Sequence, residues 1–248
     1  MSVLLIDLGN TRLKWALADS AHVWSAQGSA DPAALPELFA QWRALAVPRQ
    51  VQACSVGTEA TMRELEAFCH ASWGVSIDWL RVGREALGVS NRYRQLEQQG
   101  PDRWAAVLGA RCAHPDQALV IASAGTALTV DALTADGCFL GGMILPGYRM
   151  MKSALAVGTA RLPDASGRFH DFPTSTEDAI ETGVLTALAG SIAVMFERLQ
   201  ARGEEPLVLI SGGDAALLAP HLGSPCRLID HLALRGLAAL AFNGDVRP

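Results

Sequence analysis

The chain has 248 residues, of which 50% are hydrophobic and 18% are charged, and its formal net charge is −5 at pH 7. At this length folding hides roughly 70–75% of the extended chain's surface, so a full core needs no disulfide or metal. The absence of a basic patch argues against nucleic acid as a partner. The sequence contains no run of about 18 apolar residues, so we expect no membrane-spanning helix. Five scattered cysteines without a C-x-x-C pair indicate reduced thiols and a cytoplasmic protein.

The N-terminal stretch predicts a buried strand, a tight turn and a return strand. Residues 3–6 form a short apolar run that leads into Asp7, and Gly9 and Asn10 tolerate the positive φ of a hairpin turn. Residues 13–17 then alternate between apolar and other side chains, so one face of the return strand is apolar. A carboxylate beside a turn with free backbone N–H groups suits a metal-bound polyphosphate. An ordinary hairpin with a solvated aspartate is the alternative.

The rest of the first half predicts alternating strands and helices. A third strand over residues 22–27 precedes a helix that begins at Asp31, its expected N-cap, and ends near residue 46. Residues 84–99 are polar and predict no clear element. The other expected elements are strands over residues 51–56 and 77–82 and helices over residues 59–72 and from residue 101 onward.

The second half begins again with the same pattern, about 115 residues after the first hairpin. Residues 119–123 predict a strand, Ala124-Gly125-Thr126 a turn, and residues 127–131 a return strand. The elements expected next are a strand over residues 139–145, a helix over 148–157, a loop over 158–173, a strand over 207–211, a helix from 214, a strand over 227–229 and a closing helix over 231–242. We interpret the long loop as a lid, a partner contact or a mobile segment.

A long helix is expected between the loop and the strand at residue 207. Thr174-x-x-Glu177 is a capping-box pattern that opens this helix, which ends near Gly203. Gly183 and Gly190 within it each cost about 1 kcal/mol relative to alanine, which predicts a close approach there, inside the chain or at a dimer seam. Both halves thus predict α/β lobes, residues 1–115 and 116–248, with a cleft between them.

The Gly-Pro-Asp-Arg run at residues 100–103 is a second candidate site. It places Asp102 and Arg103 side by side at a helix start, where the helix dipole favours negative charge. Asp102 could accept a proton from a substrate hydroxyl, and Arg103 could bind a carboxylate or phosphate through two hydrogen bonds. The alternative is a helix-capping aspartate with a solvated arginine. Neither this run nor the glycine turns match a P-loop or a G-x-G-x-x-G fingerprint.

The chain resembles type III pantothenate kinases of the actin-like ATPase superfamily, also known as the Bvg accessory factor family. The matching residues run through the chain in the family's order. They are Asp7, Gly9-Asn10-Thr11, Tyr93, Gly100-Pro101-Asp102-Arg103, Ser123-Ala124-Gly125-Thr126-Ala127, Thr129-Val130-Asp131, Gly141-Gly142, Ile144, Pro146-Gly147, Leu155, Thr159-Ala160, Leu162-Pro163, Thr182-Gly183 and Ser211-Gly212-Gly213-Asp214-Ala215.

The resemblance implies two related ribonuclease H-like lobes and a role for each motif. The implied ATP-binding residues are Asp7, Gly9, Asn10, Thr11, Arg12, Leu13, Lys14, Gly125, Thr126, Gly212 and Gly213. The implied pantothenate-binding residues are Asn10, Tyr93, Gly100, Pro101, Asp102, Arg103 and, from the neighbouring subunit of the family's homodimer, Thr182. Asp102 would be the catalytic base, Asp7 the Mg²⁺ ligand, and Asp131 the residue linked to a monovalent cation, potassium or ammonium.

The implied reaction is transfer of the γ-phosphoryl group of ATP to pantothenate, the first step of coenzyme A biosynthesis. One departure concerns the pocket wall, because residues 94–99 lack the proline and the apolar residue expected before Gly100. Two alternatives remain open. The protein could be another small-molecule kinase or a phosphohydrolase of the same superfamily, or a non-catalytic nucleotide-binding regulator that kept the fold.

Overall fold

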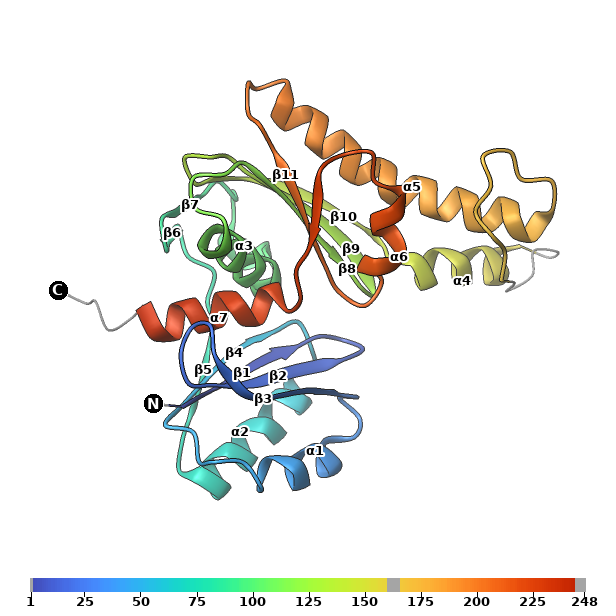
Figure 1. The fold of residues 1–248 in the computed structure, drawn as a ribbon. Coiled ribbons are helices and arrows are strands. Elements are labelled where there is room, and N and C mark those ends of the chain that lie inside the picture. The colour runs from blue at the N-terminus through green and yellow to red at the C-terminus, as the bar shows by residue number, and fades with distance from the viewer. Residues whose placement is uncertain (1, 160–165, 244–248) are drawn as a thin grey trace. The chain divides into compact units, whose positions relative to one another are not determined.

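The computed structural model describes residues 2–159 and 166–243, which form two compact units (Figure 1). The first unit comprises residues 1–115 and 231–248, and the second comprises residues 116–230. The change of unit near residue 115 lies where the sequence places a lobe boundary. The closing helix differs from expectation, because it is part of the first unit and not of the second.

The first unit is built on a five-stranded sheet with the order β3-β2-β1-β4-β5. The central strand β1 is antiparallel to β2 and parallel to β4. The elements of this unit are β1 Val3–Leu8, β2 Leu13–Ala18, β3 Trp24–Ala30, α1 Leu35–Trp42, β4 Gln50–Ser55, α2 Glu59–Trp73, β5 Ile77–Trp79, β6 Glu85–Ala86, β7 Val89–Asn91, the 3-10 helix η1 Leu96–Gln98, α3 Pro101–Ala113 and α7 Leu232–Asn243.

The two faces of this sheet carry different helices, because side chains alternate along a strand. Leu4, Ile6 and Leu8 of β1 pack on one face with α1 and α2. Val3 and Leu5 lie on the other face with residues of α3 and α7 (Figure 1). Asp7 follows the same alternation, so its side chain belongs to the face that α3 and α7 cover.

Helix α1 begins later than the sequence predicts. Its N-cap is Ala34 and not Asp31, whose carboxylate instead accepts a hydrogen bond of 2.9 Å from the backbone N–H of Ala33. This local turn uses the side chain that would otherwise cap the helix. Pro36 then sets the backbone of the first helical turn.

The closing helix joins the first unit because two glycines let α7 approach α3 at backbone distance. A Cβ at Gly109 would lie 2.8 Å from the backbone nitrogen of Gly236, and one at Gly236 would overlap with the carbonyl oxygen of Ala105. Leu234 and Leu237 of α7 are fully buried in the core cluster between this helix and the sheet. The contact therefore depends on the absence of side chains at two positions that are distant in sequence.

We expect Gly236→Ala to lower the free energy of unfolding by about 1–3 kcal/mol, because overpacking against the Ala105 carbonyl outweighs the gain of roughly 1 kcal/mol in helix propensity. Urea unfolding of the variant measures this. Gly223→Ala is the control, because a Cβ there has no described atom within 4 Å. Equal stability of the two variants would contradict the packing argument.

The second unit repeats the topology of the first. Its strands run in the order β12-β11-β8-β9-β10, with β8 antiparallel to β9 and parallel to β11. The same arrangement surrounds β1, so each unit is one copy of a common α/β plan. The elements are β8 Leu119–Ala124, β9 Ala127–Leu133, β10 Cys138–Pro146, α4 Tyr148–Gly158, α5 Thr176–Gln200, β11 Leu207–Ser211, α6 Ala215–Leu218, the 3-10 helix η2 Ala219–His221 and β12 Cys226–Leu228.

Helix α5 covers one face of the second sheet (Figure 1). Its N-cap is Ser175, whose hydroxyl accepts a hydrogen bond of 3.2 Å from the N–H of Asp178, so the expected capping box at Thr174 is one residue too early. The helix is long and apolar enough to cross a membrane by composition alone, but half of its most apolar window is buried. It packs against β8, β9 and β11, as the central helix of a globular unit does.

The glycines of α5 do not meet the close approach that the sequence predicts within the chain. A Cβ at Gly183 or at Gly190 would have no described atom within 4 Å, apart from the backbone of its own helix. Among the residues of the expected loop, 160–165 lie outside the described part of the chain, and so do the motif residues Ala160, Leu162 and Pro163.

Candidate active site

Asp7 is the first of two carboxylates that the first unit brings together. In the register of β1 it lies opposite Lys14 of β2 and beside Cys54 of β4. The Sγ atom of Cys54 lies 3.6 Å from Oδ1 of Asp7. Within residues 2–159 and 166–243, no ion pair within 4 Å reaches this half-buried carboxylate.

Burial raises the pKa of Asp7 above its ordinary value, the nearby charge of Lys14 lowers it, and the negative charge of Asp102 raises it further. An anionic Asp7 is therefore costly in the folded protein until a cation neutralises it. A carboxylate of this kind suits Mg²⁺, which is usually bound by one or two carboxylates together with substrate phosphates and several waters. No group of three or more acidic, histidine or cysteine side chains in the described part of the chain could hold a metal without such help.

Asp102 is the second carboxylate, in the first turn of α3. Its Oδ1 accepts a hydrogen bond of 2.8 Å from the N–H of Arg103. Burial raises the pKa of Asp102, while the N–H and the charge of Arg103, and more weakly the charge of Lys14, lower it. Gly100 is required beside it, because a Cβ there would overlap with the Asp102 carboxylate. A carboxylate with a raised pKa is a stronger proton acceptor once it is ionised.

Arg103 is buried, with 4% of its surface exposed, and it faces Tyr93. Its Nη1 donates to the Tyr93 hydroxyl at 3.3 Å, and its guanidinium lies 5.7 Å from the ring centroid. It is therefore not the solvated arginine of the alternative interpretation. The sequence missed the residues that hold Tyr93 in place, Arg84 and Asn91, since nothing in the polar run over residues 84–99 singles them out.

The turn after β1 has the geometry of a narrow backbone loop. The N–H of Gly9 donates to the carbonyl of Arg12 at 3.1 Å, and a Cβ at Gly9 would lie only 2.9 Å from that oxygen. Asn10, Thr11 and Arg12 are exposed at the tip, while Leu13 is buried. Arg12 extends along the sheet and donates to the hydroxyl of Ser29 at 2.8 Å.

The second unit carries an equivalent turn, joined to two other glycine turns. The N–H of Gly125 donates to the carbonyl of Ala127 at 3.0 Å, as Gly9 does to Arg12. A Cβ at Gly147 would overlap with the Gly125 carbonyl, and one at Gly212, where φ is +106°, would overlap with the Ala124 carbonyl. Thr126 and Gly213 are exposed beside these turns. The second unit thus brings together the glycines expected to bind phosphate and adenosine.

Two other expected site residues of the second unit lie elsewhere. Asp131 is 1% exposed on β9, on the sheet face opposite α5, and a Cβ on the paired Gly142 would overlap with its carboxylate. Thr182, on α5, holds the backbone of His170: its hydroxyl accepts from the N–H at 3.1 Å and donates to the carbonyl at 3.3 Å.

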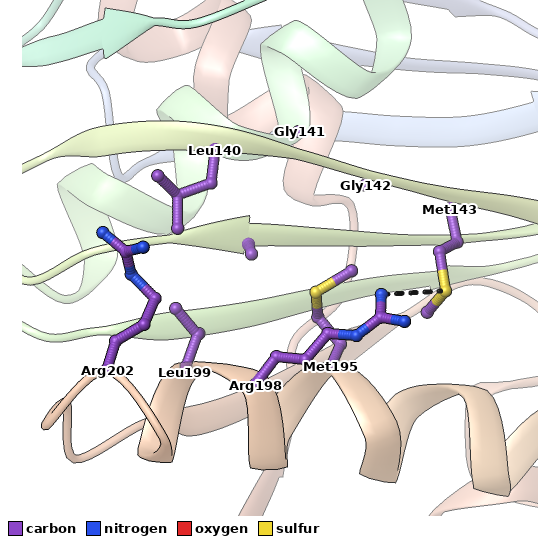
Figure 2. Close-up of a pocket in the computed structure, with 9 residues that line it drawn as sticks. Leu140, Gly141, Gly142, Met143, Met195, Arg198, Leu199 and Arg202 are labelled. Atoms are coloured by element: carbon purple, nitrogen blue, oxygen red, sulfur yellow. Dashed lines mark hydrogen bonds between the residues drawn. The ribbon is translucent and has the colours of Figure 1, made fainter.

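A cavity of about 260 Å³ lies between α5 and β10 of the second unit, and Gly142 is among the residues that line it. Figure 2 shows Met195, Arg198 and Leu199 of α5 facing Leu140 and Met143 of β10. None of the expected site residues lines it, and it contains no carboxylate. The lining of this cavity therefore gives no support to a catalytic role for it.

We expect Asp7→Asn to be more stable than the wild-type protein at neutral pH. The raised pKa means that the folded protein binds more protons than the unfolded chain above the ordinary pKa of 3.8, so wild-type stability falls as pH rises through this window. Removing the carboxylate removes that cost, about 1.4 kcal/mol for each unit of the shift.

Urea unfolding without added Mg²⁺ at neutral pH and near pH 4 measures the difference, which should shrink in acid. Asp178→Asn is the matched control, for which we expect the opposite change in the free energy of unfolding. The N–H of Arg168 lowers the pKa of Asp178, so that variant should lose stability at neutral pH. A destabilised Asp7→Asn would show that the carboxylate is a structural group.

Comparison with solved structures defines the class of protein. A Baf family structure from Campylobacter jejuni has a TM-score of 0.60 at 19% identity and covers 98% of this chain and 100% of its own. The activator of the 2-hydroxyisocaproyl-CoA dehydratase from Clostridium difficile, solved with bound ADPNP, has a TM-score of 0.57 at 14% identity and covers 100% and 99%. With the two repeated α/β units, these similarities show that the chain shares its fold with both proteins.

Sequence comparison identifies the family. The family model described as type III pantothenate kinase matches residues 3–198. The type III pantothenate kinase of Dechloromonas aromatica is 43% identical over 245 residues, covering 96% of this chain and 98% of that one. The enzyme of the same name from Chromobacterium violaceum is 42% identical over 241 residues, with the same coverage. The chain belongs to the type III pantothenate kinase family.

Proposed function

We propose that this chain transfers the γ-phosphoryl group of ATP to the primary hydroxyl of pantothenate, which yields 4'-phosphopantothenate and ADP in the first step of coenzyme A biosynthesis. The observation that carries the proposal is the pair of half-buried carboxylates, Asp7 and Asp102, close enough for the charge of one to raise the pKa of the other. Asp7 lies just before the glycine turn to which we assign phosphate binding. Asp102 lies in the first turn of α3, beside the buried Arg103.

Asp102 acts as the base in this mechanism. The hydroxyl oxygen of pantothenate attacks the γ-phosphorus, the bond from that phosphorus to the bridging oxygen of ADP breaks, and the hydroxyl proton passes to the Asp102 carboxylate. Burial raises the pKa of Asp102 and so makes its carboxylate a stronger base, while the charges of Arg103 and Lys14 favour the ionised form that accepts the proton. Apart from this proton transfer, the protein contributes to phosphoryl transfer mainly by positioning the reactants and stabilising the charge of the transition state.

The nucleotide is held by backbone groups more than by side chains. The Gly9–Lys14 segment and the Gly125-Thr126 turn would lie against the phosphate groups, since the tips of both turns are exposed. Gly212 and Gly213 would leave room for the adenosine moiety. Asp7 would hold Mg²⁺, which would neutralise phosphate charge during transfer. The fit is supported by an Asp7 carboxylate whose negative charge is disfavoured by burial and met by no close ion pair among the described residues.

Three finer assignments complete the proposal. Asp131 would serve a monovalent cation, potassium or ammonium. The enzyme would act as a cytoplasmic homodimer, in which Thr182 reaches the neighbouring subunit's pantothenate, and would bind neither nucleic acid nor membrane. The exposed small residues of α5 support the dimer, since Gly183 and Gly190 have no close neighbour among the described residues of their own chain.

The test is ADP release with and without pantothenate, on wild-type enzyme and Asp102→Asn. We expect wild-type release to depend on pantothenate and the variant to remain folded with kcat lower by about 10²–10⁴-fold, the usual contribution of a general base. Asp78→Asn, at an exposed position, is the control and should retain activity. Turnover of Asp102→Asn at the wild-type rate would rule out the base assignment, and ADP release indifferent to pantothenate would indicate a phosphohydrolase.

A second prediction concerns the cation. Wild-type kcat/KM should be higher in potassium or ammonium than in sodium. Asp131→Asn should lose this preference and fall roughly tenfold in potassium, because a buried carboxylate no longer balances the ion. Steady-state kinetics at constant ionic strength measure both effects. A variant that keeps the wild-type potassium response would show that the cation, if used, binds elsewhere.

A further inference from the structure

Two buried amides join the segment that carries Tyr93 to the turn that carries the catalytic aspartate. Asn91 is 5% exposed and Gln99 is 2% exposed. The Nδ2 of Asn91 donates a hydrogen bond of 2.8 Å to Oε1 of Gln99. Gln99 directly precedes Gly100, at the position where the family resemblance leads us to expect an apolar residue.

The orientation of both amides is determined by their partners. The Oδ1 of Asn91 accepts from the N–H of Tyr93 at 2.9 Å, and its Nδ2 donates also to the carbonyl of Gly83 at 3.1 Å. Turning the Asn91 amide over would place donor against donor and acceptor against acceptor. Gln99 must therefore present its oxygen to Asn91, which leaves its Nε2 donor facing elsewhere.

That Nε2 group is buried and has no hydrogen-bond partner among residues 2–159 and 166–243. A buried donor without an acceptor is costly, and native proteins rarely keep one unless a ligand or a water satisfies it. Gln99 is connected to two residues assigned to pantothenate: Gly100 follows it directly, and Asn91, to which it bonds, accepts from the N–H of Tyr93.

Hydrogen bonds in the segments around Gln99 hold its side chain in place. Arg84 donates to the carbonyls of Tyr93 and Arg94, the latter at 3.1 Å. The backbone N–H of Gln99 donates to the carbonyl of Leu96 at 3.1 Å and ends the short 3-10 helix before Gly100. An amide held in this way keeps its free N–H in one place, as a specificity contact requires.

We propose that Gln99 is a substrate-specificity residue: its Oε1 ties the Tyr93 segment to the Gly100 turn through Asn91, and its Nε2 donates a hydrogen bond to a carbonyl-type oxygen of the bound acceptor. The inference rests on the proposed function. Pantothenate offers two such acceptors, its amide carbonyl and its carboxylate. A site built to donate to a substrate oxygen discriminates strongly against analogues that lack it, because its own donor is then left unpaired.

The experiment uses three variants of the full chain. Gln99→Glu keeps an oxygen for Asn91 and replaces the N–H by a group that donates only when protonated. Gln99→Leu removes both interactions. Gln98→Leu changes the exposed neighbour and is the matched control. KM for pantothenate, KM for ATP and kcat are measured for each, with thermal unfolding as the check on folding.

We expect Gln99→Glu to raise KM for pantothenate about tenfold near pH 8 and by less near pH 6, where burial keeps the new carboxyl partly protonated and able to donate. KM for ATP should remain unchanged, and the wild-type enzyme should lack this pH dependence. Gln99→Leu should raise KM for pantothenate at both pH values, and Gln98→Leu should match the wild-type enzyme. Pantothenol, in which an alcohol replaces the carboxylate, separates the two acceptors: the Gln99→Leu effect persists if the amide carbonyl is bound and disappears if the carboxylate is.

An unchanged KM for pantothenate in folded Gln99→Glu overturns the inference, and so does a loss of stability or kcat without a change in that KM. Gln99→Glu decides the matter if Gln99→Leu does not fold, since it preserves the bond to Asn91. Wild-type ADP release is measured first. If it does not depend on pantothenate, the proposed function fails, which is a different result from a wild-type enzyme whose Gln99 variants behave normally.

Discussion

The burial of two carboxylates is the constraint that distinguishes the first unit, because it raises the pKa of both. Asp7 lies on the face of β1 that α3 and α7 cover, and Asp102 lies at the start of α3, so the fold brings two like charges together where water is scarce. The negative charge of each carboxylate is therefore unfavourable in the folded protein until a cation or a hydrogen-bond donor meets it. Perturbed carboxylates of this kind are typical of functional sites.

Glycine residues allow close contacts between backbone segments in both units. The α3–α7 contact and the close approach of the Gly147 and Gly212 turns to residues 124 and 125 depend on glycine, because a Cβ at any of these positions would overlap with a carbonyl oxygen. In the first case the result is packing, which fixes the helix that carries Asp102. In the second it is a set of turns packed closely at the ends of their strands, to which we propose that phosphate binds. The same chemical property, a missing side chain, thus allows close backbone contacts in both units.

Local patterns predicted much of this fold, because strand alternation, helix periodicity and turn residues act within short stretches. The strand–turn–strand repeat and most elements appear where the sequence places them. The α3–α7 contact was not predictable, because Gly109 and Gly236 have meaning only when paired. The order within residues 84–99 was missed because Arg84 and Asn91 bond to backbone groups and leave no periodic signal. The roles of the site residues came from family resemblance; the charge coupling of Asp7 and Asp102 came from the structure.

The central claim is that these carboxylates direct a phosphoryl group to a hydroxyl and not to water. Phosphorus NMR of the enzyme with ATP, Mg²⁺ and pantothenate tests it most directly, because it identifies the product of the γ-phosphoryl group. We expect a new phosphomonoester signal that grows in step with ADP and requires pantothenate. Formation of inorganic phosphate and ADP at the same rate with or without pantothenate would contradict it.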